Sequence, residues 1–150
     1  MSAYEITNAQ FCTFLNAIGA TEEGYYADIK YIHLSKNSQI VYENGTFQPK
    51  TNTESFPVTN VTWFGAKNFC QFAGGRLPTE TEWYYCAMGT NTSNLDNLAW
   101  YKANSGNMIH KVGEKAANSK GLYDILGNVA EWTSDWYNET MYSSSSNTIT

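Results

Sequence analysis

Three short helices are marked in this sequence by their start and stop signals. A threonine followed three residues later by Gln or Glu can form a capping box, and this pair occurs at Thr7 and again at Thr79. Thr62 can cap another helix between them. Glycines that can end these helices follow each run at Gly19, Gly74–Gly75 and Gly89. Apolar residues at helical spacing should face the core, and they are Phe11, Phe14, Leu15 and Ile18, then Ala66, Phe69, Cys70 and Ala73, then Trp83, Cys86 and Ala87.

A β-hairpin is predicted at Gln39–Gln48, between the first two helices. Asn44-Gly45 supplies the two positive-φ residues of a tight turn, and β-forming side chains flank it. After Gly89 the chain is rich in Asn, Ser and Gly, which is typical of long loops. We therefore expect one α+β domain over residues 1–150, with a mobile tail at about residues 138–150.

Composition narrows the classes of function. Aromatic residues make up 15% of the chain and charged residues only 15%, so burial of rings can overcome the entropy cost of folding. The net charge is −5 and the nine cations form no cluster, which argues against nucleic acid as a partner. No apolar stretch approaches membrane-spanning length and the N-terminus lacks a signal pattern. We expect a soluble protein whose compartment the sequence leaves open.

The three cysteines give no sign of a metal or disulfide site. Cys12, Cys70 and Cys86 have neither paired nor metal-ligand spacing, and each falls within a predicted helix. Buried free thiols are the expected state.

The glycine-containing segment at residues 121–132 is a candidate metal site. Asp124, Gly127, Val129 and Glu131 lie within eight residues, so two carboxylates and two backbone carbonyls can converge there. An all-oxygen ligand set suits a hard cation such as Ca²⁺. The alternative is a glycine turn in which Asp124 makes an Asx-type bond and Glu131 caps backbone amides.

Two other sets of residues are better explained by a structural role than by catalysis or ligand binding. Arg76 is expected to form a buried ion pair or to bind carbonyls at the start of the third helix, and Glu82 belongs to its capping box. The aromatic residues Trp132, Trp136 and Tyr137 are expected to pack in the core or against a sheet before they serve a ligand.

Four motifs in order resemble the formylglycine-generating enzyme family, also called sulfatase-modifying factors. They are Tyr4–Phe11, Phe56–Trp63, Gly75–Trp83 and Gly121–Trp132, and they span nearly the whole chain. The resemblance implies a C-type-lectin-like fold with short helices, small antiparallel sheets and long loops. It also implies structural calcium at Asp124, Gly127, Val129 and Glu131. Ala130 departs from the family pattern, which has tryptophan before this glutamate.

A second calcium site of the family is not expected here. Asn104 and Ser105 match its first half, but no aspartate lies between residues 105 and 123.

The resemblance also implies that the family's oxidation chemistry is missing from this sequence. Family enzymes oxidise a substrate cysteine with a copper-binding cysteine pair located after the Gly-Asn-Val-x-Glu-Trp motif, whereas the last cysteine here is Cys86. No catalytic residues and no copper are therefore expected. We favour a non-catalytic lectin-like binding or scaffold domain, with a protein or small molecule as its unknown ligand. The alternative is a fragment of a formylglycine-generating enzyme. The sequence leaves three ways to complete the sheet: a further C-terminal segment, a partner chain, or closure of the remaining part on itself by rearrangement.

Overall fold

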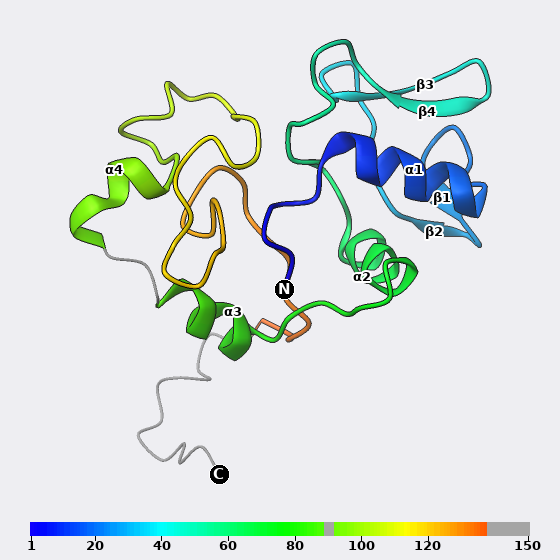
Figure 1. The fold of residues 1–150 in the computed structure, drawn as a ribbon. Helices are drawn as coiled ribbons and strands as arrows, with labels where there is room; N and C mark the ends of the chain where they lie inside the picture. Colours follow the sequence, from blue (N-terminus) through cyan, green and yellow to red (C-terminus); the bar gives the residue numbers. More distant parts are fainter. Residues whose placement is uncertain (89–91, 138–150) are drawn as a thin grey trace.

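The chain folds into short helices and two small antiparallel hairpins, as predicted for an α+β domain (Figure 1). The computed structural model describes residues 1–88 and 92–137, so Gly89 and the expected tail lie outside the described residues. The elements are α1 (Asn8–Ile18), β1 (Tyr25–Tyr26), β2 (Ile29–Lys30), β3 (Ile40–Glu43), β4 (Thr46–Pro49), α2 (Trp63–Phe72), α3 (Glu80–Ala87), the 3₁₀ turn η1 (Thr92–Asn94) and α4 (Leu95–Leu98). Within the described ranges no helix is long and apolar enough to cross a membrane.

Both predicted capping boxes are confirmed. At α1 the Thr7 hydroxyl accepts from the Gln10 amide at 3.3 Å, and the Gln10 side chain accepts from the Thr7 amide at 2.9 Å. Thr79 and Glu82 make the same reciprocal pair at α3, at 3.1 and 2.8 Å. Gly19 ends α1 in the left-handed region, with φ of 69°, so that its amide can bind the last carbonyls of the helix.

The second helix ends as predicted but buries less than predicted. Thr62 caps α2, and the helix ends at Phe72, followed by the exposed C-cap Ala73 and by Gly74 in the left-handed region with φ of 79°. Phe69 stacks on Phe11 of α1 at 5.7 Å between ring centroids and is buried. Ala66 and Cys70 are only half-buried, because they line a cavity and do not touch a second layer of core.

The third helix also buries less than predicted. Ala87 is buried, whereas Trp83 and Cys86 are half-buried. Trp83 instead directs its indole nitrogen to a carboxylate of a distant loop, which is described below. The predicted apolar face of α3 is therefore only partly a core face.

The main core forms where α1 lies across the β3–β4 hairpin and against α2. Phe14 and Leu15 of α1 are 1% and 0% exposed, and the Phe14 ring is stacked on Tyr31. In the hairpin Tyr42 pairs with Phe47, and the turn residues Asn44 and Gly45 have φ of 52° and 81°. The hairpin prediction is thus confirmed, including its turn.

A second, smaller hairpin was not predicted. Tyr26 of β1 pairs with Ile29 of β2 across a turn in which Ala27 and Asp28 both have positive φ. An Ala-Asp turn carries neither the Asn-Gly nor the Asp-Gly signal, so a local pattern search passes over it.

The N-terminal segment, residues 3–7, runs between two halves of the molecule. In Figure 1, α1, α2 and both hairpins lie to one side of it, whereas α4 and the loops of residues 99–128 lie to the other. The segment contacts both halves: Ile6 accepts from the Val58 amide at 2.8 Å, and Ala3 accepts from the Tyr123 amide at 2.9 Å. The candidate site is built around this segment.

Candidate functional site

The loop of residues 121–132 is held in a tight shape that requires its glycine. Asp124 and Asn128 have φ of 60° and 59°, and the Gly127 amide donates to the Asp124 carbonyl at 2.8 Å. The Asn128 amide donates to the Trp100 carbonyl at 2.7 Å. A Cβ at Gly127 would overlap that same carbonyl oxygen, so a larger residue would push the loop off its neighbour.

Asp124 is a buried carboxylate with one oxygen left without a partner. It is 1% exposed, and its Oδ2 accepts from the Gly113 amide at 2.7 Å. Its Oδ1 is buried and has no hydrogen-bond partner. Burial raises the pKa of Asp124; the bond from Gly113 opposes that rise, and the charge of Glu114 adds to it. A buried, unsatisfied carboxylate oxygen is costly unless a cation or a donor meets it.

Glu131, the other predicted carboxylate ligand, is tied to α3. Its Oε2 accepts from the Trp83 indole nitrogen at 2.6 Å. The residue keeps part of its surface in solvent, but the protein around the carboxyl group removes enough water to raise its pKa, and the charge of Asp124 raises it further.

Glu5 is a third carboxylate at this site, and it was missed in the sequence. It is 7% exposed; its Oε1 accepts from the Val129 amide at 3.2 Å and its Oε2 from the Asn128 side chain at 2.7 Å. Burial raises the pKa of Glu5 to about 8, and the charges of Asp124 and Glu131 add to the rise. Its place within the Tyr4–Phe11 motif was the available signal, but nothing local in the sequence brings residue 5 next to residue 129.

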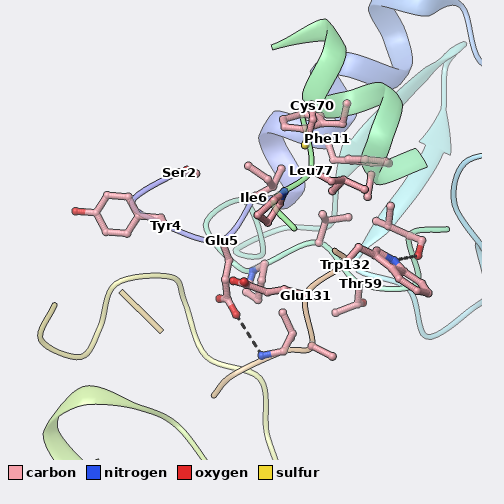
Figure 2. A pocket seen from close by; sticks show the side chains of 18 of the residues that line it. Ser2, Tyr4, Glu5, Ile6, Phe11, Thr59, Cys70, Leu77, Glu131 and Trp132 are labelled. Atoms are coloured by element: carbon pink, nitrogen blue, oxygen red, sulfur yellow. Dashed lines mark hydrogen bonds between the residues drawn. The ribbon is translucent and has the colours of Figure 1, made fainter. Parts of the chain in front are cut away.

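A cavity of about 390 Å³ opens beside these carboxylates. Figure 2 shows Phe11 and Cys70 on one side of it and the carboxyl groups of Glu5 and Glu131 on the other. Its apolar walls come from both halves of the chain and include Ile6, Val58, Val61, Phe69, Leu77 and Val129. Trp132 also lines the cavity and is fixed by a bond from its indole nitrogen to the Val61 carbonyl at 2.9 Å.

The four predicted calcium ligands lie in one loop, and the charge of Asp124 raises the pKa of Glu131. The calcium assignment itself stays a prediction. No group of three or more His, Cys, Asp or Glu side chains that could hold a metal occurs within residues 1–88 and 92–137. A site here would depend on backbone carbonyls for part of its ligand set, as the prediction requires.

Two structural predictions need correction. Arg76 does pair with Glu82, at 2.7 Å, but the side chains are 68% and 47% exposed, so the ion pair lies at the surface. Arg76 also binds the Leu77 carbonyl at 3.1 Å, as expected for a residue at the start of α3. Because the Arg76 guanidinium binds both Glu82 and the Leu77 carbonyl, it stays outside the core.

The predicted aromatic packing is also wrong. Trp132 is 49% exposed, whereas Trp136 and Tyr137 are 92% and 91% exposed. Trp132 is held by a hydrogen bond from its indole nitrogen to the Val61 carbonyl, and it lines the cavity. In the described part of the chain, no core residues or sheet cover these rings.

The cysteines remain free, as predicted, but only one is buried. Cys12 lies in the core, and burial raises its pKa to about 12, so the reactive thiolate is disfavoured. Cys70 on the cavity wall and Cys86 on α3 are half-buried.

Comparison with known families identifies the domain. Residues 1–150 match the family model described as a sulfatase-modifying factor enzyme 1-like domain. The chain belongs to this family. It is 33% identical over 147 residues to the serine/threonine-protein kinase pkn1 of Chlamydia caviae, covering 95% of this chain and 23% of that protein. It is 29% identical to the formylglycine-generating enzyme of Mus musculus, covering 91% of this chain and 49% of that enzyme.

A solved structure of similar fold supports the assignment. The Treponema denticola variable protein 1 superposes with a TM-score of 0.59 and 25% identity, over 91% of this chain and 64% of that one. The fold of this sulfatase-modifying factor domain is thus C-type-lectin-like, as the motifs predicted. The chain spans about a quarter of the kinase and about half of the mouse enzyme.

Proposed function

We propose that this sulfatase-modifying factor domain is a non-catalytic binding or scaffold module whose ligand occupies the cavity beside Glu5. The observation that carries the proposal is the cavity itself: about 390 Å³ of space with mostly apolar walls and a few polar groups, which is the usual make-up of a binding site. The ligand is either a small molecule or a protein segment. Such a segment would come from a C-terminal extension of this chain or from a partner protein.

The placement of the thiols supports a non-catalytic role. A copper centre of the family type needs two thiolates together, whereas Cys12, Cys70 and Cys86 lie on three different helices and form no pair. The thiol most deeply buried has its pKa raised to about 12. The domain also occurs within a protein named as a kinase, where it covers 23% of the length.

The catalytic part of the proposal is tested with a sulfatase-type peptide. Copper-loaded protein is incubated with a Cys-x-Pro-x-Arg peptide, and mass spectrometry should find the cysteine unchanged. The resemblance to the mouse enzyme carries the alternative, a piece of a formylglycine-generating enzyme. Turnover by this chain that disappears in a Cys70→Ser or Cys86→Ser variant would refute catalytic silence.

The binding part is tested through Cys70, which lines the cavity. Phenethyl alcohol, a neutral apolar probe, should slow the reaction of Cys70 with iodoacetamide, because an occupied cavity blocks access to that thiol. Cys86 lies on α3 and does not line the cavity, so its reaction rate is the internal control. Equal Cys70 rates with and without saturating probe would contradict the binding proposal.

We further propose a structural Ca²⁺ site formed by Asp124, Gly127, Val129 and Glu131. The favouring observation is the unsatisfied Oδ1 of Asp124, buried in a loop where Glu131 adds a second negative charge. Two carboxylates and two carbonyls, completed by water, make a suitable ligand set for this cation. Bound Ca²⁺ would remove both the repulsion and the unsatisfied oxygen, and so stabilise the folded state by mass action.

Thermal denaturation in EDTA and in millimolar Ca²⁺ tests the metal site. We expect a higher midpoint with Ca²⁺ for the unaltered chain and no shift for Asp124→Asn, which keeps the acceptor for the Gly113 amide but loses the charge. Glu80→Gln, on exposed surface at α3, is the matched control. A midpoint that does not respond to Ca²⁺ in a verified metal-free sample would rule the site out.

A further inference from the structure

We propose that Tyr4 and Tyr123 form an oxidative crosslinking site, at which a one-electron oxidant derived from a peroxide joins the two phenol rings as dityrosine. The inference goes beyond the binding role and does not depend on a ligand in the cavity. Figure 2 shows the Tyr4 ring directed away from the carboxyl groups of Glu5 and Glu131. The proposal is carried by the contact between two rings that lie far apart in the sequence.

The geometry of the pair suits coupling of the two rings. Tyr4 and Tyr123 are stacked, with 4.5 Å between ring centroids and 19° between ring planes. The two side chains also share a hydrogen bond, which raises the pKa of Tyr4. A stack that also brings the hydroxyl groups together sets the same edges of both rings side by side. The ring carbons next to the hydroxyl groups, where phenoxyl radicals couple, therefore lie near each other.

The backbone around the pair holds it in this geometry. The Tyr123 amide donates to the Ala3 carbonyl at 2.9 Å, so the segments that carry the two rings are tied together. Gly113 packs against the other ring so closely that a Cβ there would lie 2.6 Å from a ring carbon of Tyr4. Two reacting groups that are already held in contact react far faster than groups that must meet by diffusion.

An oxidant can reach this pair from solvent. Tyr4 is 45% exposed and Tyr123 is half-buried. Among the described residues, the other tyrosines in ring contact are Tyr26 and Tyr31, whose centroids are 6.2 Å apart and whose planes are tilted by 55°. Tyr31 is only 4% exposed, which shields it from an oxidant. A crosslink within one molecule is therefore expected at Tyr4 and Tyr123.

The reaction transfers two electrons from the chain to the oxidant. Each phenol gives one electron to the oxidant and its hydroxyl proton to water, which leaves a phenoxyl radical. The radicals join through a new carbon–carbon bond, and the hydrogens on the two joined carbons then move to the oxygens and restore both phenols. The chain loses two hydrogens in total. The product closes a long loop covalently and should stabilise the folded state by restraining the unfolded chain, as a disulfide does.

Photo-oxidation of the 150-residue chain with tris(bipyridine)ruthenium(II) and persulfate tests the proposal. Persulfate accepts the two electrons. In dilute protein, the monomer should lose the mass of two hydrogens and gain dityrosine fluorescence. Mass spectrometry of its digest should find the peptides that contain Tyr4 and Tyr123 joined. The crosslinked monomer should also unfold at a higher urea concentration than the untreated one.

Two variants and a denatured sample serve as controls. Tyr4→Phe keeps the ring but loses the hydroxyl group, so the joined peptide should disappear. Tyr26→Phe removes a tyrosine of nearly the same exposure, 44%, and should leave the yield unchanged. In denaturing urea the yield should fall sharply, because the rings are no longer held together.

The joined peptide decides the outcome. Its absence from the folded monomer, under conditions that convert free tyrosine to dityrosine, would overturn the proposal. Equal yields from folded and denatured chains would also overturn it, since the folded geometry would then contribute nothing. Neither result depends on whether the cavity binds a ligand, so the proposed binding role is tested separately.

Discussion

Ionisation of Glu5 should make the stability of this domain fall as pH rises. The folded state raises the pKa of Glu5 from the ordinary 4.5 to about 8, mainly by burial. Below pH 4.5 the group is protonated in both the folded and the unfolded chain, so its contribution to stability is fully present there. Between about pH 4.5 and pH 8 the unfolded chain ionises first, which favours unfolding, and above about pH 8 the loss is complete.

The difference between the two pKa values corresponds to about 5 kcal/mol in the free energy of unfolding. That is a large part of the ~5–15 kcal/mol that stabilises an ordinary domain. Raised pKa values at Asp124 and Glu131 act in the same direction, so the measured decline includes their contribution as well.

Glu5→Gln isolates the contribution of Glu5. Glutamine keeps an acceptor for the Val129 amide but sets an NH₂ group against the Asn128 side-chain amide, so the variant should be less stable by about 1–3 kcal/mol at low pH. It cannot ionise, and its decline with pH should be shallower by up to about 5 kcal/mol. The two stability curves should therefore converge or cross near pH 8.

Urea denaturation in EDTA at about half-unit steps from pH 5 to pH 8.5 measures both curves. Glu43→Gln, an exposed glutamate on β3, serves as control and should follow the unaltered chain. Parallel curves for Glu5→Gln and the unaltered chain would show that Glu5 ionises as readily in the folded state as in the unfolded one, and the reasoning would be wrong.

Three further substitutions test the packing and the caps by urea denaturation. Leu15→Ala, at a position with 0% exposure, should lower stability by about 2–5 kcal/mol, and a loss below 1 kcal/mol would mean that the core relaxes around it. Gly127→Ala should cost at least about 2 kcal/mol, because its methyl group overlaps the Trp100 carbonyl; an unchanged midpoint would argue against the tight loop. Thr79→Ala should cost about 1 kcal/mol through loss of the α3 cap, and no loss at all would contradict the capping box.

Local signals in the sequence were sufficient for the elements that depend on neighbours in the chain. The Thr7 and Thr79 capping boxes and the Asn44-Gly45 turn are where they were predicted, since each is complete within four residues. The fold class and family followed from four ordered motifs.

The candidate site was only partly predictable because its groups come from distant segments. Glu5 meets Asn128 and Val129 across 123 and 124 residues, and no spacing rule connects them. The burial of α2 also depended on tertiary context: Ala66 and Cys70 had the helical spacing of core residues, but they face a cavity. A periodic apolar pattern identifies the inward face of a helix without showing whether other side chains fill the space it faces.

The position of the N-terminal segment has a consequence for the order in which this domain can form during synthesis. Residues 3–7 are synthesised well before their partners, because Ala3 and Glu5 bind Tyr123, Asn128 and Val129, and Glu5 lies 123 and 124 residues before the last two. The α1 core and the β3–β4 hairpin use contacts within the first half and can assemble earlier. Until the loop of residues 121–132 has been synthesised, Glu5 remains solvated and ionised, and the two halves of the domain are not joined. Closing so long a span late makes this step a slow one, governed by long-range contacts.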